Sequence, residues 1–207
     1  MGIKRNLMVA RRKLADLAEM VIGARILRSE NVGFAFEEFH LKRFFSYFQI
    51  DCVFDVGANV GQYAELLRKR VGFKGQIVSF EPIPDLTELL RRKAERDSNW
   101  HIEPVALSKT VGQAIFNVMA ERQFSSLLSP KHDECDKFAD LNKAVRSIPV
   151  VTSTLKIEYL KYKEKLGFSR PFLKMDTQGN DVAVVHSAEE TINEFIGLQS
   201  ELSVKRL

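Results

Sequence analysis

The amino-acid sequence predicts an α/β fold, in which helices cover both faces of a mostly parallel β-sheet. From residue 51 onward, short apolar segments of strand length alternate with longer segments of helical periodicity, and this alternation is typical of a parallel sheet with crossover helices. The chain has 207 residues, 45% hydrophobic and 28% charged, which is enough to bury the core of one such domain. We expect a helical segment over residues 1–50 and one α/β domain over residues 51–207.

Two helices are expected before the α/β domain. Apolar residues recur at intervals of three and four over residues 7–24, which marks one face of an amphipathic helix. Residues 1–50 carry nine Lys or Arg and five Asp or Glu, whereas residues 51–207 carry twenty-two of each. The basic helix either packs on its own domain or makes a weak contact with a membrane surface through residues 1–28. A second helix, rich in phenylalanine, is expected over residues 35–48.

The α/β domain is expected to contain five main strands, four helices and a β insertion. The predicted strands are residues 52–56, 76–81, 101–106, 171–176 and 197–202, and the predicted helices are residues 62–71, 84–97, 155–166 and 180–195. Residues 107–153 interrupt this rhythm. They hold two more strand-like segments, 113–119 and 148–152, and a polar loop at 129–140.

Composition excludes several classes of protein. The domain carries equal numbers of basic and acidic residues, whereas a nucleic-acid-binding protein concentrates Lys and Arg into a patch. Of the two cysteines, Cys52 lies in an apolar run and Cys135 in a polar loop, which predicts neither a disulfide framework nor a thiolate metal site. No signal peptide is visible, and no apolar run approaches the roughly 18 residues of a membrane span. We therefore expect a cytoplasmic protein.

The segment "VFDVGANVGQYA", residues 53–64, leads from a predicted strand into a predicted helix through Gly57 and Gly61. In an open parallel sheet, ligands bind beyond the carboxyl ends of the strands. The glycines let the backbone turn sharply close to a ligand, and the helix N-terminus directs N–H groups toward it. Asp55 precedes the turn, where its charge would repel a pyrophosphate and favour an ammonium or sulfonium group.

Glu81 lies twenty residues after Gly61, at the end of the second predicted strand. A carboxylate at this position can accept hydrogen bonds from both hydroxyls of a ribose. The turn reads G-A-N-V-G, which departs from the G-x-G-x-x-G spacing of dinucleotide-binding proteins. S-adenosylmethionine has an ammonium, a sulfonium and no phosphate, so the chemistry favours it over NAD. A nicotinamide-dependent oxidoreductase remains the alternative.

Seven segments of the chain resemble the ordered motifs of the FkbM-type methyltransferase family. They are "VFDVGANVGQYA", "IVSFEP", "PVALS", "SSLL", "VVTSTL", "FLKMDTQGND" and "GLQSELSV". The resemblance implies a Rossmann-like class I methyltransferase sheet and S-adenosylmethionine as methyl donor. It also implies a hydroxyl group on a sugar, polyketide or other small metabolite as acceptor.

The resemblance also assigns donor-binding roles residue by residue. The family's donor-binding turn matches Asp55, Gly57, Asn59 and Gly61, and its ribose-binding acid matches Glu81. The positions that would enclose the adenine are Ile83, Ala106 and Leu107.

Two carboxylates are candidates for catalysis. Asp176 ends the fourth predicted strand and Glu201 lies near the end of the fifth, so adjacent parallel strands would bring both to the rim that carries Asp55. One of them can act as general base, or the two can share a divalent cation such as Mg²⁺ that lowers the pKa of the acceptor hydroxyl. Alternatively, Asp176 caps its turn and Glu201 binds nearby backbone.

The end of the chain predicts an incomplete sheet. Members of the resembled family usually continue past the fifth strand with two further strands, so the resemblance implies a C-terminally truncated domain whose final strands are missing after Leu207. An apolar strand left at the edge over residues 197–204 would favour a homodimer. A module that binds S-adenosylmethionine or a partner without catalysis is then the alternative to an active enzyme.

Overall fold

The structure is a computed structural model that describes residues 32–119 and 144–200. Contacts divide the chain into two units, residues 1–41 and 42–207, and helix α2 (Val32–Phe48) runs across this division. Among the described residues, no helix is long and apolar enough to cross a membrane.

Some sequence predictions fall outside the described residues. They are the basic amphipathic helix and its membrane-surface contact through residues 1–28, the polar loop at 129–140, and Glu201.

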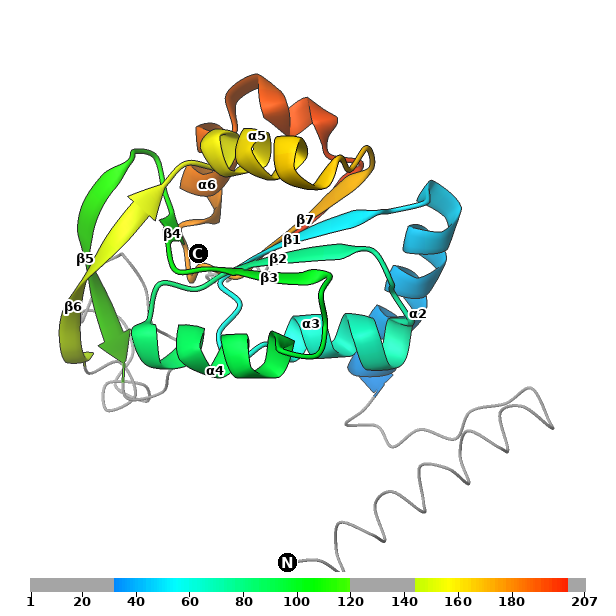
Figure 1. The fold of residues 1–207 in the computed structure, drawn as a ribbon, viewed down its shortest axis with the longest axis horizontal. Helices are drawn as coiled ribbons and strands as arrows, with labels where there is room; N and C mark the ends of the chain where they lie inside the picture. The colour runs from blue at the N-terminus through cyan, green and yellow to red at the C-terminus, as the bar shows by residue number, and fades with distance from the viewer. Residues whose placement is uncertain (1–31, 120–143, 201–207) are drawn as a thin grey trace, which may run out of the picture. The chain divides into compact units, whose positions relative to one another are not determined.

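The second unit is built on a five-stranded parallel sheet with the order β3-β2-β1-β7-β8 (Figure 1). Its strands are β1 (Cys52–Val56), β2 (Gln76–Phe80), β3 (Trp100–Glu103), β7 (Pro171–Met175) and β8 (Gly197–Ser200). Every residue of β1 and β7 is buried, as expected for central strands of a parallel sheet that is covered on both faces. The predicted α/β class is confirmed.

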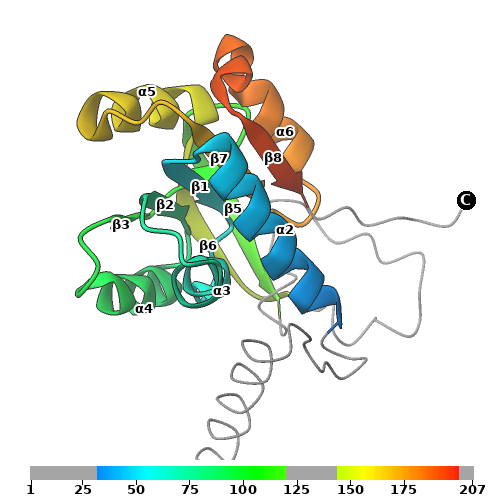
Figure 2. The same cartoon turned by 90° about the vertical axis from the view of Figure 1, so that its right-hand side faces the viewer.

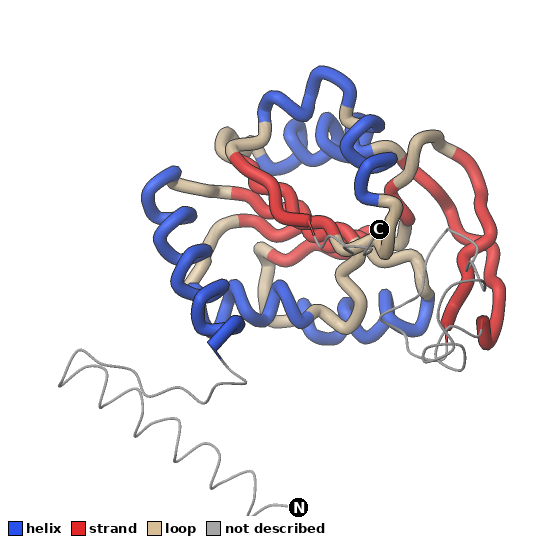
Figure 3. The backbone as a smooth tube through the Cα atoms, turned by 180° about the vertical axis from the view of Figure 1, so that it is seen from behind, coloured by secondary structure: helices blue, strands red, loops and turns tan. Residues whose placement is uncertain are grey.

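Helices cover both faces of this sheet (Figures 1 and 3). Helices α5 (Leu155–Leu166) and α6 (Asp181–Ser187) lie on one face, where Tyr159 and Val184 join a core cluster with Phe54 and Leu173. Helices α3 (Gln62–Leu66) and α4 (Pro84–Ala94) lie on the opposite face. Figure 2 shows the second part of α2 beside the sheet. The centre of the Phe45 ring lies 5.0 Å from that of Phe172 on β7.

Local sequence signals fix the ends of these helices. Helix α4 begins with Pro84, whose missing N–H and fixed φ suit the first helical position. Thr154 caps α5 by accepting a hydrogen bond from the Ile157 N–H at 3.3 Å, and the helix ends at Gly167 with φ 65°. Helix α3 continues into a π-helical segment, η2 (Leu67–Val71), so that the two together cover the predicted helix 62–71.

The predicted strand 101–106 is divided in the structure. Residues Trp100–Glu103 form β3 at the edge of the main sheet, whereas β4 (Ala106–Leu107) belongs to a second sheet. The reason is Pro104, which has no N–H for a ladder hydrogen bond.

The predicted helix 180–195 is likewise divided. Helix α6 ends at Ser187, and a 3₁₀ segment, η5 (Glu189–Glu194), follows. Glu189 adopts φ 49°, which an α-helix does not accommodate. The Ser187 hydroxyl donates to the Val184 carbonyl at 2.7 Å and so competes with the helical backbone bonds.

The predicted β insertion is present as a second, three-stranded sheet of order β4-β6-β5. Strands β5 (Gly112–Met119) and β6 (Ala144–Ser153) form a long antiparallel ribbon, and β4 pairs with β6 in parallel. Figure 1 shows the ribbon beside the carboxyl ends of the main strands. The insertion therefore lies along the edge of the sheet at which ligands of parallel α/β folds bind.

Candidate functional site

One cavity lies at the carboxyl ends of β1, β2 and β7, next to the second sheet. It brings together most of the residues predicted from the sequence, namely Gly57, Asn59, Glu81, Ile83, Ala106, Leu107 and Asp176. Asp55 and Gly61 are not among its lining residues. Glu201 lies outside the described residues.

The turn after β1 needs glycine at Gly57. Its φ is +76°, and a Cβ atom added there would lie 2.1 Å from the backbone oxygen of Asp176. The N–H groups of Gly57 and Ala58 both point to the Phe80 carbonyl, at 3.1 Å each. Gly57 thus lets β1, β2 and β7 approach one another at the floor of the cavity.

Gly61 has a different role. It precedes α3 with φ +84°, and a Cβ atom there would meet the side chains of Leu90 and Trp100 at 2.8 and 3.1 Å. Gly61 therefore does not line the cavity. Its lack of a side chain allows the start of α3 to pack against α4 and β3.

Glu81 is held rigidly at the cavity. The residue is only 4% exposed. Its Oε2 accepts a hydrogen bond from the Asn59 N–H at 2.8 Å, and its Oε1 accepts one from the Ile83 N–H at 3.0 Å. Burial raises the pKa of Glu81 to about 7, although the two backbone N–H groups oppose this shift. Each carboxylate oxygen has a second acceptor position, so the group can still bind ligand hydroxyls.

Asp55 lies beneath the turn and does not line the cavity. The residue is fully buried, and its carboxylate accepts a hydrogen bond from the Ser79 hydroxyl at 3.2 Å and forms an ion pair with Lys174 Nζ at 3.2 Å. The predicted acid is therefore charge-compensated from the neighbouring strand β7.

Apolar side chains from both sheets form the wall of the cavity. Ile83, Leu86, Ala106, Phe116 and Val150 make one buried cluster, and all but Val150 line the cavity. Phe116, on β5, is a cavity residue that the sequence reasoning missed. The signal is present in the alternation of β5, where Phe116 is buried and Ile115 is 59% exposed.

Asp176 follows β7 and lines the same cavity. Its N–H donates to the Val56 carbonyl at 3.0 Å, and its Oδ1 accepts a hydrogen bond from Gln178 Nε2 at 2.7 Å. Asn180, also missed, donates from Nδ2 to the Leu107 carbonyl at 3.1 Å. These bonds join the turn after β7 to both sheets and fix the position of the Asp176 carboxylate.

Asp181 is a structural residue of this turn. Its Oδ1 accepts hydrogen bonds from the Thr177 N–H at 2.9 Å and from the Thr177 hydroxyl, and its Oδ2 accepts one from the Ser200 hydroxyl. It therefore connects the turn to the end of β8. Within the described residues, no group of three or more His, Cys, Asp or Glu side chains could hold a metal ion.

A five-stranded parallel sheet with helices on both faces, a glycine turn after its central strand and a cavity at the strand ends define a Rossmann-like methyltransferase fold. Residues 55–201 match the family described as the methyltransferase FkbM domain. The chain belongs to this family and is a methyltransferase, which confirms the resemblance seen in the sequence. No curated protein matches the chain.

Proposed function

We propose that this methyltransferase uses S-adenosylmethionine as its donor and methylates a hydroxyl oxygen of a small metabolite, such as a sugar or a polyketide. The observation that carries the proposal is the buried Glu81 carboxylate, held by two backbone N–H groups at the edge of a largely apolar cavity. A ribose diol needs such an acceptor, and an adenine ring needs an apolar enclosure.

The residues present fit the adenosine part of this donor. Glu81 would hold the ribose, and Ile83, Ala106, Leu107 and Phe116 would enclose the base. Gly57 has no side chain at the point where a Cβ atom would collide with the Asp176 backbone. The cavity is lined by the carboxylates of Glu81 and Asp176 and by no Lys or Arg among the described residues, which suits a cationic ligand without phosphates.

The donor supplies a methyl group activated on a sulfonium, which an acceptor oxygen takes by direct displacement. The acceptor hydroxyl must lose its proton. Asp176 would take this proton, because it is the other carboxylate besides Glu81 that lines the cavity among the described residues. Gln178 orients the Asp176 carboxylate through its hydrogen bond to Oδ1. A divalent cation shared by Asp176 and Glu201 remains a prediction, because Glu201 lies outside the described residues.

Calorimetric titration tests the choice of donor. We expect S-adenosylhomocysteine to bind with a micromolar dissociation constant and NAD to give no heat of binding, because the turn lacks the dinucleotide spacing. Binding of NAD alone would instead support the nicotinamide-dependent oxidoreductase.

Donor binding is expected to weaken at acidic pH. Because the pKa of Glu81 is about 7, its ionised fraction falls from roughly 90% at pH 8 to roughly 10% at pH 6, and binding that needs the carboxylate weakens about tenfold. Titration of S-adenosylhomocysteine at both pH values measures this change. A Glu81→Gln variant has no such proton to lose, so its remaining affinity should not follow this profile.

The same pKa predicts the sign of a stability effect without ligand. The folded-state pKa of Glu81 lies above the ordinary 4.5, so the residue favours the folded protein below pH 4.5, and this contribution is lost as the pH rises through about 7. The Glu81→Gln variant should lack this contribution in denaturant unfolding measured at both ends of the interval.

A further inference from the structure

A row of polar side chains crosses the main sheet just before the strands end. Ser79, Asp55, Lys174 and Gln199 lie directly opposite one another on β2, β1, β7 and β8. We call these four residues the polar row. Such a row is unusual in the middle of a buried parallel sheet, whose strands are otherwise apolar.

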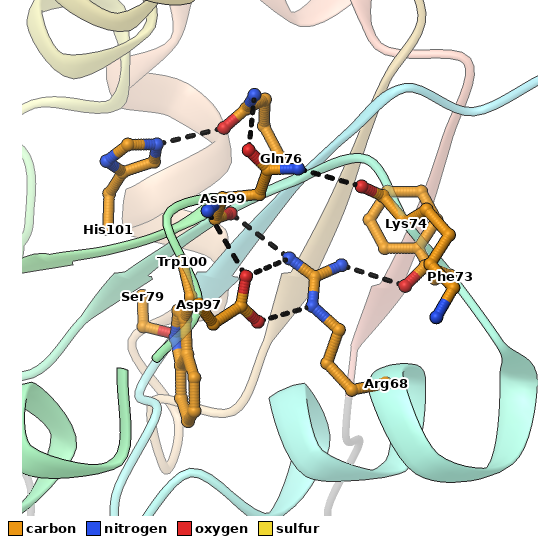
Figure 4. Close-up of polar contacts among 9 residues, drawn as sticks. All are labelled: Arg68, Phe73, Lys74, Gln76, Ser79, Asp97, Asn99, Trp100 and His101. Atoms are coloured by element: carbon orange, nitrogen blue, oxygen red, sulfur yellow. Dashed lines mark hydrogen bonds and ion pairs between the residues drawn. The ribbon is translucent and has the colours of Figure 1, made fainter. Parts of the chain in front are cut away.

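The polar row is joined by contacts between neighbouring side chains. At its centre, Asp55 accepts a hydrogen bond from Ser79 and pairs with Lys174, whose side chain is only 10% exposed. The indole N–H of Trp100 donates to the Ser79 hydroxyl at 2.9 Å (Figure 4). On the far side, the Tyr63 ring lies 5.3 Å from Lys174 Nζ, and its hydroxyl donates to Gln199 Oε1 at 3.0 Å.

The polar row lies directly below the candidate site. Glu81, Gly57 and Asp176 each follow a member of the row by two positions. Each of these three residues lies just beyond the end of its strand, and two residues of chain span at most about 7 Å. The central charges, Asp55 and Lys174, are therefore one step beneath the cavity floor.

The charges of this pair reach the cavity. At Glu81, which lines it, the Asp55 carboxylate raises the pKa and the Lys174 ammonium lowers it. Stability alone is a weak reason for such a pair, because a buried ion pair can often be replaced by apolar residues without loss. An electrostatic role toward the ligand is the stronger explanation.

We propose that Lys174 lowers the preference of the site for the donor over the product, because its positive charge cancels the negative charge of Asp55 beneath the cavity. The inference rests on the proposed function. S-adenosylmethionine has a sulfonium, whereas the product, S-adenosylhomocysteine, has a neutral thioether at the same position. An uncompensated Asp55 would favour the donor over the product, and an uncompensated Lys174 would favour the product.

The test measures the dissociation constants of both ligands for the full chain and three variants. In Lys174→Met, we expect the affinity ratio of donor to product to rise about fivefold, because the Asp55 charge would then attract the sulfonium through a medium of intermediate dielectric constant. In Asp55→Asn, we expect the ratio to fall by a similar factor. The double variant, Asp55→Asn with Lys174→Met, should return it close to that of the unmodified chain.

These readouts separate a charge effect from loss of structure. A purely structural role would weaken both ligands together and leave the ratio unchanged in both single variants, which would overturn the inference. Lys156→Met is the matched control, because Lys156 pairs with Glu189 and Glu190 on the surface, and its ratio should not move. If Lys174→Met does not fold, the other two variants still test the inference. The affinity ratio should fall in Asp55→Asn and return close to that of the unmodified chain in the double variant.

The proposed function and this inference fail in distinguishable ways. If the unmodified chain binds neither ligand, the proposed function is wrong and the inference falls with it. If the unmodified chain binds both ligands but the two single variants do not shift the ratio in opposite directions, only the role of Lys174 is wrong.

Discussion

Replacing Glu81 with alanine is expected to weaken binding of S-adenosylhomocysteine by about 2–3 kcal/mol, or roughly 30- to 150-fold. In the proposed function, the substitution removes a charged acceptor of two ribose hydroxyls. It also leaves the N–H groups of Asn59 and Ile83 without the carboxylate that they bind in the structure. Calorimetry on variants that retain the native circular dichroism spectrum measures the effect.

Glu88→Ala is the control for this experiment. Glu88 lies on α4, and its 56%-exposed side chain pairs with Arg92 on the surface, so an effect of at most a few tenths of a kcal/mol is expected. An unchanged dissociation constant in folded Glu81→Ala would remove Glu81 from the donor site.

Replacing Gly57 with alanine is expected to destabilise the fold by about 3 kcal/mol or more and to abolish donor binding. The new methyl group would lie 2.1 Å from the Asp176 backbone oxygen. Relief would require β1 and β7 to separate at the point where the Asp176 N–H binds the Val56 carbonyl. Denaturant unfolding measures the loss of stability.

Gly72→Ala is the control that separates the cost of a positive φ from the cost of a steric collision. Gly72 has nearly the same φ, +78°, but a Cβ atom there would meet no described atom within 4 Å. This variant should lose only the roughly 1 kcal/mol that a positive φ costs alanine. Equal losses in the two variants would contradict the close approach of Gly57 to Asp176.

The sequence predicts the main sheet well because its central strands, β1, β2 and β7, are largely buried and segments of helical periodicity separate the strands. The meeting of Gly57, Asn59 and Glu81 at one cavity could be predicted from their places after the first two strands, since strand ends in a parallel sheet converge on one edge. Pro104 was a visible signal for the division between β3 and β4. The length of β6 was not predictable from its short apolar centre, because pairing with β5 extends it.

The surroundings of Asp55 and Phe116 depend on contacts that the sequence does not display. In β1, all residues are buried, so no polar alternation shows which face Asp55 occupies, and its partner Lys174 lies far along the chain. Phe116 reaches the cavity because the β insertion folds beside the strand ends. Both positions are set by sheet pairing between distant segments.

A crystal structure of the complex with S-adenosylhomocysteine tests the central claim most directly. We expect the ribose hydroxyls within hydrogen-bonding distance of the Glu81 carboxylate and the adenine against Ile83, Leu107 and Phe116. The sulfur should lie on the side of the cavity formed by Asp176. A ligand bound elsewhere, or one with its ribose away from Glu81, would contradict the proposed donor site.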